Sequence, residues 1–320
     1  MLISIVIRAR NEEKHIAHLL EGIARQSEKD LEVILVDSGS TDRTLDIASQ
    51  FPVRVVHIQP EEFTFGYALN RGISQASGDF IVIASAHVFP VYPDWLESLL
   101  APFADPQVAL TYGKQRGNTL NKFSEQQIFQ RWYPNLSQPH QPHPFCNNAN
   151  AAIRRELWMS NHYNETLPAL EDLEWAHRIM DLGYGISYVT EAEVVHVHEE
   201  TPRGVYNRYR REAMAFKRLF PHESYHPWNL AHNLTTNILS DLWQAARQHR
   251  LTSVLSEIIW FRWMQFWGTY KGYHQAGPLT WQLRQTFYYP GATSLSAQAD
   301  TRDIPPIQYT ALGEAHPHER

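Results

Sequence analysis

The first 109 residues alternate between apolar runs and segments of helical spacing, and this alternation constrains the fold more than any other feature. Apolar runs with the length of buried strands occupy residues 2–7, 31–36, 53–58 and 80–84. Segments with apolar side chains at helical spacing occupy residues 12–25, 40–50 and 67–76. Strands that alternate with helices predict a parallel sheet with helices on both faces. We therefore expect a Rossmann-like α/β fold here.

Composition narrows the class of protein. The 320-residue chain has a net charge of −6 and a pI near 6.3, which disfavours a nucleic-acid partner. Its single cysteine, Cys146, excludes an internal disulfide and is typical of a reducing compartment, and a buried small residue is its simplest role. The sequence has no secretory signal and no apolar run of the ~18–20 residues that a transmembrane helix needs. We therefore expect a cytoplasmic protein.

The sequence predicts three regions. Residues 1–200 carry the α/β pattern, with a nucleotide-binding half to about residue 112 and an acceptor half from about residue 113. Within the second half, we expect residues 114–143 to form loop and short helix over the site, NNANAAIRRELW to enter a helix, and ISYVTEAEVVHVH to form two strands. Residues 201–288 are expected to form a helical, aromatic-rich extension, and residues 289–320 a disordered tail.

Two acidic motifs adjoin the predicted strands. Asp37 ends the second strand in VDSGSTD, where Ser38 and Gly39 let a ligand approach the backbone. An ordinary turn with a helix cap explains the same residues equally well. Asp79, in SGDF, directly precedes the fourth strand and is also compatible with a simple turn. The sequence contains neither GxGxxG nor GxxxxGKS, which disfavours a dinucleotide enzyme and a P-loop NTPase.

The fourth strand, IVIAS, runs into a histidine, His87. Strands of a parallel sheet hold ligands at their carboxyl ends, so a polar side chain there indicates chemistry. A late strand ends on a second pair, His196 and His198, whose two-residue spacing places both rings on one face. Such a pair is more often a polar strand end than a ligand pair. Together with His87 it gives three candidate imidazoles.

Several motifs in order carry a family resemblance. The opening strand with RARNEE is followed by VDSGSTDRT, LNRGISQASGDFIVIAS, the PDWLESLL segment, EDLEWAHR and VVHVH. This series, which covers about residues 2–209, resembles the family 2 glycosyltransferases, which have a GT-A fold and an inverting mechanism. The resemblance implies a mixed, mostly parallel sheet with helices on both faces and a helical C-terminal extension.

The resemblance implies roles for individual residues. Asp37 and Asp79 would hold the nucleobase and ribose, with Ser38, Arg8 or Arg10 beside them and Arg71 near the diphosphate. Asp172, next to Glu171, would be the general base that takes the acceptor hydroxyl proton, and Arg178 would lie on the same side of its helix. Without the resemblance, Glu171 and Asp172 read as an ordinary acidic first turn of a helix.

The resemblance fails at one motif. Most family members end the fourth strand on an Asp-any-Asp triplet that binds a divalent metal, whereas this chain has Ser85, Ala86 and His87. His87, with His196 and His198, could bind a metal such as Mn²⁺ or Mg²⁺, with imidazole favouring Mn²⁺. The imidazoles could instead stabilise the diphosphate directly, or the site could be inactive.

Amides and aromatic rings indicate a sugar or acceptor contact. Asn147, Asn148 and Asn150 precede Trp158 within three turns, and amides with a stacked ring are typical of sugar sites. Helix capping would need only one of the three amides. Basic and aromatic residues also crowd residues 203–220 and 258–273. A packed helical subdomain or a dimer interface is the simpler interpretation of that pattern, and peripheral membrane contact is the alternative.

Together these features predict an inverting hexosyltransferase. It would move a hexose or deoxyhexose from a nucleoside diphosphate sugar to a glycan or lipid-linked acceptor in surface polysaccharide biosynthesis. It could lie at the inner face of the plasma membrane and form a homo-oligomer. A silent sugar-nucleotide or glycan-binding protein on the same fold is the alternative function.

Overall fold

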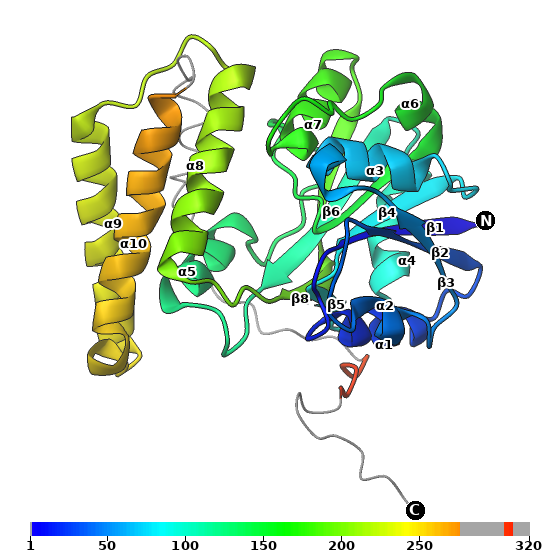
Figure 1. The fold of residues 1–320 in the computed structure, drawn as a ribbon, viewed down its shortest axis with the longest axis horizontal. Helices are drawn as coiled ribbons and strands as arrows, with labels where there is room; N and C mark the ends of the chain where they lie inside the picture. Colours follow the sequence, from blue (N-terminus) through cyan, green and yellow to red (C-terminus); the bar gives the residue numbers. More distant parts are fainter. Residues whose placement is uncertain (1, 276–303, 310–320) are drawn as a thin grey trace, which may run out of the picture.

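A computed structural model describes residues 2–275 and 304–309, and its centre is an eight-stranded mixed sheet (Figure 1). The strand order is β3-β2-β1-β4-β7-β6-β8-β5. The strands are β1 (Ile3–Ala9), β2 (Leu31–Asp37), β3 (Val53–His57), β4 (Phe80–Ser85), β5 (Val88–Pro90), β6 (Val108–Arg116), β7 (Asn150–Arg154) and β8 (Gly185–His196). Four of the pairings are parallel, and β5 and β7 supply the antiparallel ones. The predicted fold class is confirmed.

Helices cover both faces of this sheet because side chains alternate along each strand. In β1, Ile5 and Ile7 lie in one core and Val6 in the other. Helices α1 (Ile16–Ala24), α2 (Thr44–Ala48) and α4 (Trp95–Leu100) pack on the first face. Helices α3 (Phe65–Ile73), α6 (Arg155–Ser160) and α7 (Glu171–Asp181) pack on the second. Two 3-10 turns, η1 (Pro60–Glu62) and η2 (Ala101–Ala104), complete the domain.

Two local expectations need correction, and a third, loop with a short helix before β7, agrees with the structure. NNANAA does not enter a helix: Asn150 begins strand β7, which pairs antiparallel with β4, and α6 starts only at Arg155. ISYVTEAEVVHVH forms one strand, β8, up to His196, and its mostly polar residues 190–193 lie where the register with β6 shifts, between the pairs Gly113–Val189 and Gln115–Val194. Between β6 and β7 lies a ten-residue helix, α5 (Phe123–Trp132), with loop on either side.

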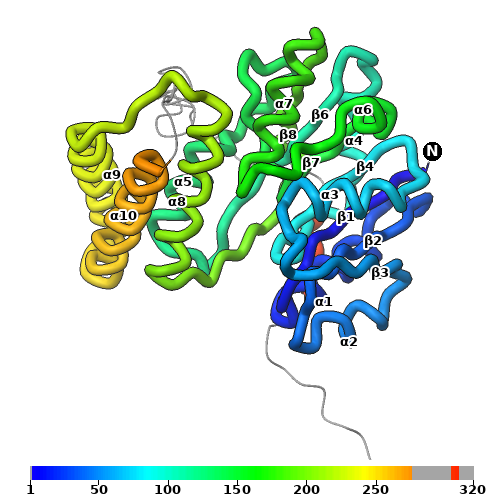
Figure 2. The backbone as a smooth tube through the Cα atoms, turned by 45° about the horizontal axis from the view of Figure 1, so that its top comes forward, coloured from blue at the N-terminus to red at the C-terminus, as the bar shows by residue number. Residues whose placement is uncertain are grey.

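A helical layer follows the sheet domain. Helices α8 (Pro202–Leu219), α9 (Pro227–Arg247) and α10 (Leu251–Tyr273) lie side by side, with α5 against them (Figures 1 and 2). Gly268 and Gly272 let α10 approach α8, since an added Cβ would lie 2.5 Å and 2.3 Å from the carbonyl oxygens of Tyr206 and Arg210. A buried ion pair at 2.7 Å between Arg262 and Asp241 joins α10 to α9.

A short C-terminal segment returns to the sheet domain. The Ile307 amide donates to the Val91 carbonyl just after β5, and the Tyr309 hydroxyl donates to the Pro90 carbonyl. The expected disorder of the tail is therefore corrected for residues 304–309. The other residues beyond 289 lie outside the described part of the chain.

Candidate functional site

Polar side chains from four strands converge at the carboxyl edge of the sheet. Arg8 of β1 is in register with Ser85 of β4, and Ala9 is in register with Asp37 of β2. Strand β8 is parallel to β6 and ends on His196 at the same edge. The loop before β7 joins them, because the Ser85 amide donates to the Ala149 carbonyl. This edge is where an open α/β sheet holds a ligand.

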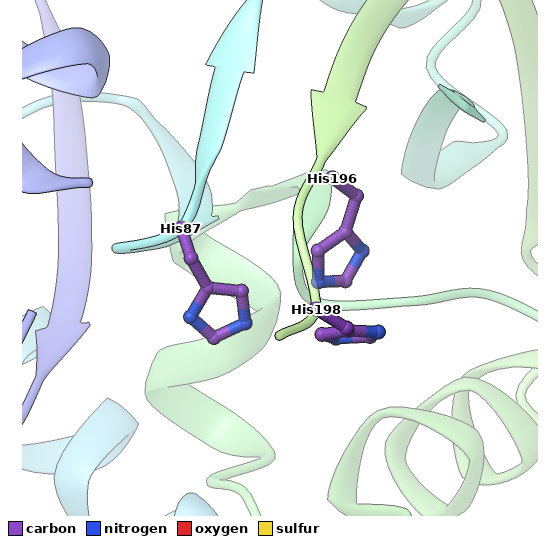
Figure 3. A group of neighbouring side chains, drawn as sticks. All are labelled: His87, His196 and His198. Atoms are coloured by element: carbon purple, nitrogen blue, oxygen red, sulfur yellow. The ribbon is translucent and has the colours of Figure 1, made fainter. Parts of the chain in front are cut away.

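Three histidines form a compact cluster there (Figure 3). One ligand nitrogen from each of His87, His196 and His198 lies within 4.8 Å of the others. The rings of His196 and His198 have centroids 4.2 Å apart, and His87 stacks on His196 at 5.2 Å. The two-residue spacing in β8 and the turn after β4 therefore bring the rings together, as the sequence suggested.

Each ring is held by an acceptor at Nδ1. The acceptors are Glu12 for His87, at 2.8 Å, Gln115 for His196, at 2.7 Å, and Glu125 for His198, at 2.7 Å. A proton on Nδ1 leaves Nε2 of each ring unprotonated, and that of His87 lies 3.2 Å from the Ser85 hydroxyl. Within the described residues, Nε2 of His196 is buried and has no hydrogen-bond partner. An unpartnered buried nitrogen is costly unless a ligand satisfies it.

The cluster therefore fits a divalent metal. Imidazoles oriented by carboxylate or amide acceptors at their second nitrogen are the usual arrangement at protein metal sites. Burial lowers the pKa of His196 well below its usual value, and the neighbouring His198 and His87 lower it further. A neutral imidazole is the form that coordinates a metal.

Arg208 of α8 supports this cluster from the helical layer. Its guanidinium donates to Glu125 at 2.6 Å and also pairs with Glu200 at 2.7 Å. Despite burial, which acts in the opposite direction, the charges of His198 and Arg208 hold the pKa of Glu125 far below its usual range. Glu125 therefore stays ionised and accepts the hydrogen bond from Nδ1 of His198. Sequence reasoning missed Glu12, Gln115, Glu125 and Arg208 because they come from four separate segments.

The acidic start of α7 lies beside Arg8. Glu171 pairs with Arg8 at 2.9 Å, and Asp172 accepts the Asn148 amide at 3.2 Å. Leu170, just before them, has a left-handed backbone with φ of 59°. Such strain in a residue other than glycine costs about 1–3 kcal/mol and is typical of functional sites. Burial, and next the Glu171 carboxylate, raise the pKa of Asp172 to about 7.

A phenyl ring lies between two guanidinium groups at the same edge. Arg8 lies 4.9 Å above the Phe65 ring, and Arg211 of α8 lies 5.0 Å from it. Helix α8 thus contributes a second arginine near the site. Sequence reasoning missed Phe65 and assigned the basic, aromatic run of α8 to a packed helical subdomain or a dimer interface.

Asp37 stabilises the turn that follows β2. Its carboxylate accepts the amides of Gly39 and Ser40 at 3.1 Å, which fixes the turn after β2. Gly39 has φ of +85°, and an added Cβ would lie 2.8 Å from Pro60. Only glycine fits there, because the Pro60 ring packs against this backbone. Ser38 is buried and donates its amide to the Ala9 carbonyl.

Two expected nucleotide residues lie elsewhere. Asp79 precedes β4, and its amide donates to the Leu2 carbonyl, so it lies at the amino edge of the sheet. The length of β4 separates it from the site by about 20 Å. Arg71 is exposed in the last turn of α3, about 9 Å along the helix from Phe65. The position of Asp79 contradicts its assignment, and the assignment of Arg71 remains a prediction. Arg10 is exposed just beyond β1.

Three expected sugar contacts are structural. Asn150 is fully buried, accepts from the Trp95 indole and donates to the Ala192 carbonyl. Trp158 is a core residue whose indole donates to Asn70. Arg178 pairs with Glu174 at 2.7 Å and donates to the His162 carbonyl.

Two of the expected amides do lie near the acidic pair, Glu171 and Asp172. Asn148 also donates to Glu171 at 3.3 Å, and Asn147 is half-buried next to Asn148. Cys146 is buried, as expected.

Comparisons with known proteins agree with this geometry. A family model described as "Glycosyl transferase family 2" matches residues 4–159. The O-antigen chain rhamnosyltransferase WbaN of Salmonella anatum is 29% identical over 198 residues, which are 58% of this chain and 62% of that protein. RfbN, an O-antigen chain rhamnosyltransferase of Salmonella typhimurium, is 25% identical over 65% of this chain and 70% of its own length. The chain thus spans less than two thirds of the first relative.

Solved structures show the same fold. The mannosyltransferase PcManGT of Pyrobaculum calidifontis, solved with GDP-Man and Mn²⁺, superposes with a TM-score of 0.56 at 20% identity, over 89% of this chain and 87% of that one. Glucosyl-3-phosphoglycerate synthase of Mycobacterium tuberculosis, solved with Mn²⁺, UDP-glucose and phosphoglyceric acid, gives 0.51 at 24% identity over 68% and 79%.

Proposed function

We propose that the chain, which has the GT-A fold and whose residues 4–159 match the family 2 glycosyltransferase model, is an inverting member of that family that transfers a hexose or deoxyhexose from a nucleoside diphosphate sugar to a glycan. One observation supports this most: Asp172, Arg8 and the histidine cluster lie at one edge of the sheet. A base for the acceptor and groups for a diphosphate are the two requirements of such a transfer. A silent binding protein would not need a carboxylate whose pKa is raised to about 7.

The relatives suggest the kind of sugar and acceptor. Two of them are O-antigen chain rhamnosyltransferases. We propose a deoxyhexose such as rhamnose as the donor sugar, and a growing, lipid-linked surface polysaccharide as the acceptor. Such an acceptor would place the enzyme at the cytoplasmic face of the membrane.

The reaction needs one proton transfer. Asp172 takes the proton from the acceptor hydroxyl as its oxygen attacks the anomeric carbon, and the bond to the diphosphate oxygen breaks with its electron pair on the diphosphate. Arg8 pairs with Glu171 beside it, and burial together with the Glu171 carboxylate raises the pKa of Asp172 into the range of a useful base. Asp37, Ser38 and the turn that follows β2 would hold the nucleobase and ribose. Phe65, between Arg8 and Arg211, borders the same space.

His87, His196 and His198 would hold a divalent metal at the diphosphate. When bound, the metal neutralises charge on the leaving diphosphate. Three imidazoles suit Mn²⁺ better than Mg²⁺, which prefers oxygen ligands. Direct stabilisation of the diphosphate by the imidazoles is the alternative, and the low pKa of His196 makes a cationic ring there unfavourable.

The proposed function is tested by nucleotide release. We expect release from one nucleoside diphosphate deoxyhexose or hexose in a panel of UDP, dTDP and GDP sugars, with an oligosaccharide or lipid-linked acceptor, and faster release with Mn²⁺ than with Mg²⁺. Thermal stabilisation by a nucleotide without release, at every metal concentration and with every acceptor, would instead identify a binding protein.

The pH profile should report the base. Because the pKa of Asp172 is raised to about 7, the carboxyl is protonated below that pH and cannot accept the acceptor proton. We expect kcat/KM at saturating Mn²⁺ to rise about tenfold per pH unit well below pH 7 and to level off above it. A profile that is flat from pH 5.5 to 8.5, with unchanged binding of the donor, would contradict the role of Asp172.

A further inference from the structure

Helices α9 and α10 expose a row of large apolar side chains. We call this the outer face, and it consists of Leu239, Trp243, Leu251, Leu255, Ile259 and Trp263. Their exposed fractions lie between 37% and 66%. The four residues on α10 follow one another at four-residue spacing, which places them along one side of the helix. Trp263 stacks on Trp267 at 5.8 Å, and Trp267 stacks on Tyr270 at 5.6 Å, so the row continues as aromatic rings.

The helical layer does not use these side chains for its own packing. The buried residues of α10, such as Ile258, Phe261 and Phe266, lie on the rest of its circumference. The helix is thus apolar on its packed side and on its exposed side. A helix that only covers a soluble domain would carry polar residues on the second side. Contiguous exposed apolar residues of this kind mark a contact surface.

The charges around the outer face have one sign. Residues 227–275 contain two carboxylates, and both are engaged: Asp241 pairs with buried Arg262, and Glu257 accepts the Phe123 amide. The exposed charges are Arg247, Arg250 and Lys271. Arg247 lies 4.6 Å from the Trp243 ring, and Lys271 lies 4.7 Å from the Trp267 ring. This local positive charge contrasts with the net charge of −6 of the whole chain.

We propose that the outer face docks on an anionic lipid bilayer, with α9 and α10 lying in the plane of the interface. Tryptophan rings and aliphatic side chains enter the boundary between head groups and acyl chains, while arginine and lysine stay with the lipid phosphates. No helix within the described residues is long and apolar enough to span a membrane, so the contact is along the surface. A second copy of the chain would need a complementary acidic apolar surface, and the outer face supplies no carboxylate for a symmetric contact.

Docking in this way would bring lipid near the catalytic edge. Helix α10 packs closely on α8 through Gly268 and Gly272, and Arg208 of α8 holds the Glu125 and His198 pair. Neighbouring helix axes lie about 8–10 Å apart, so the histidine cluster is separated from the bilayer by about two helix layers. That consequence rests on the proposed transfer to a lipid-linked acceptor, whereas the docking itself does not.

Flotation of the full chain with vesicles tests the proposal. We expect the protein to float with vesicles that contain 30% phosphatidylglycerol, and at least tenfold less with pure phosphatidylcholine. Leu255→Gln with Trp263→Gln should lower the apparent vesicle affinity at least ~10-fold. Arg247→Gln with Lys271→Gln should lower the vesicle affinity about 5-fold for each cation and make it less sensitive to salt, because Arg250 remains. Nucleotide release with a soluble acceptor should stay within twofold in all variants, which separates docking from the proposed catalysis.

Matched controls make the result decisive. Met159→Gln with Leu182→Gln removes two apolar side chains, 60% and 59% exposed, from α6 and the end of α7, and Arg43→Gln removes an exposed cation near α2. These variants should bind vesicles like the unaltered protein, and all variants should keep its melting temperature within a few degrees. Equal binding by the outer-face and control variants would overturn the proposal. So would a stable dimer that the outer-face changes dissociate, with no vesicle binding in any variant.

Discussion

Asp172→Asn is expected to lower kcat by about 10²–10⁴-fold, the usual contribution of a general base, while the affinity for the nucleoside diphosphate changes by less than a few fold. The amide keeps the shape of the side chain and its contact with the Asn148 backbone but cannot take a proton. Initial rates of sugar transfer and a titration with the nucleoside diphosphate measure the two quantities. A loss of nucleotide affinity with little change in kcat would place Asp172 in the donor site instead.

The same variant has a second signature in stability. Folding raises the pKa of Asp172 from its ordinary value of 3.8 to about 7. Between these two pH values the folded protein keeps a proton on Asp172 that the unfolded chain has lost. This group therefore destabilises the fold as pH rises towards 7. We expect Asp172→Asn to raise the melting temperature by a few degrees at pH 8 and by less at pH 5. Calorimetry at the two pH values measures the difference.

Asp79→Asn is the matched control. Asp79 sits at the amino edge of the sheet, about 20 Å from the base, so its replacement should leave kcat and nucleotide affinity within about twofold. A large loss of nucleotide affinity in this variant would mean that the donor binds at the other edge of the sheet.

Local pattern predicted the fold of the first half because each element there is encoded in its own residues. The strands that contain Ile5, Val33 and Val82 are mostly apolar runs, and the helix that contains Leu19 has its apolar residues at helical spacing. Strand β7 was missed because NAAIR has few β-branched residues. Its conformation comes from pairing on both sides, with β4 and β6.

The sequence predicted the location of a candidate site residue correctly where the position of that residue within its own strand determines which edge of the sheet it occupies. Asp37 and His196 end strands and His87 follows β4 by two residues, so the edge they occupy follows from strand direction. Strand direction also excludes Asp79 from that edge, because this residue precedes β4. Trp158 and Asn150 failed for another reason. Their partners, Asn70 and Trp95, are 88 and 55 residues away, and no local pattern shows that the polar groups are already satisfied.

The residues that orient the histidines could not be predicted from the sequence, again because their partners are far away along the chain. Glu125 on α5 and Arg208 on α8 are 83 residues apart, and each looks like an ordinary charge on an amphipathic helix. Only the fold shows that Glu125 is buried between Arg208 and His198. The helical extension is therefore part of the support of the site, because Arg208 and Arg211 both come from α8.

His196→Ala is expected to weaken Mn²⁺ binding at least ~100-fold, since it removes the buried nitrogen at the centre of the cluster. Electron paramagnetic resonance of free Mn²⁺, with nucleoside diphosphate present and no acceptor, measures the affinity without turnover. Glu125→Gln should weaken it by about 10–100-fold, because His198 loses its charged acceptor while all three imidazoles remain. Its melting temperature must be measured alongside, because the change also leaves buried Arg208 with one carboxylate fewer.

His177→Ala is the control. His177 is exposed on α7, and within the described chain Asp181 is the carboxylate that its ring contacts. It should leave Mn²⁺ affinity unchanged. Two results would reject a metal at the cluster: equal Mn²⁺ affinity in the His196 and His177 variants, or sugar transfer that a chelator does not slow while His196→Ala abolishes it. The second result would assign the imidazoles to the diphosphate itself, because a direct hydrogen bond from a ring needs no metal but still needs the ring.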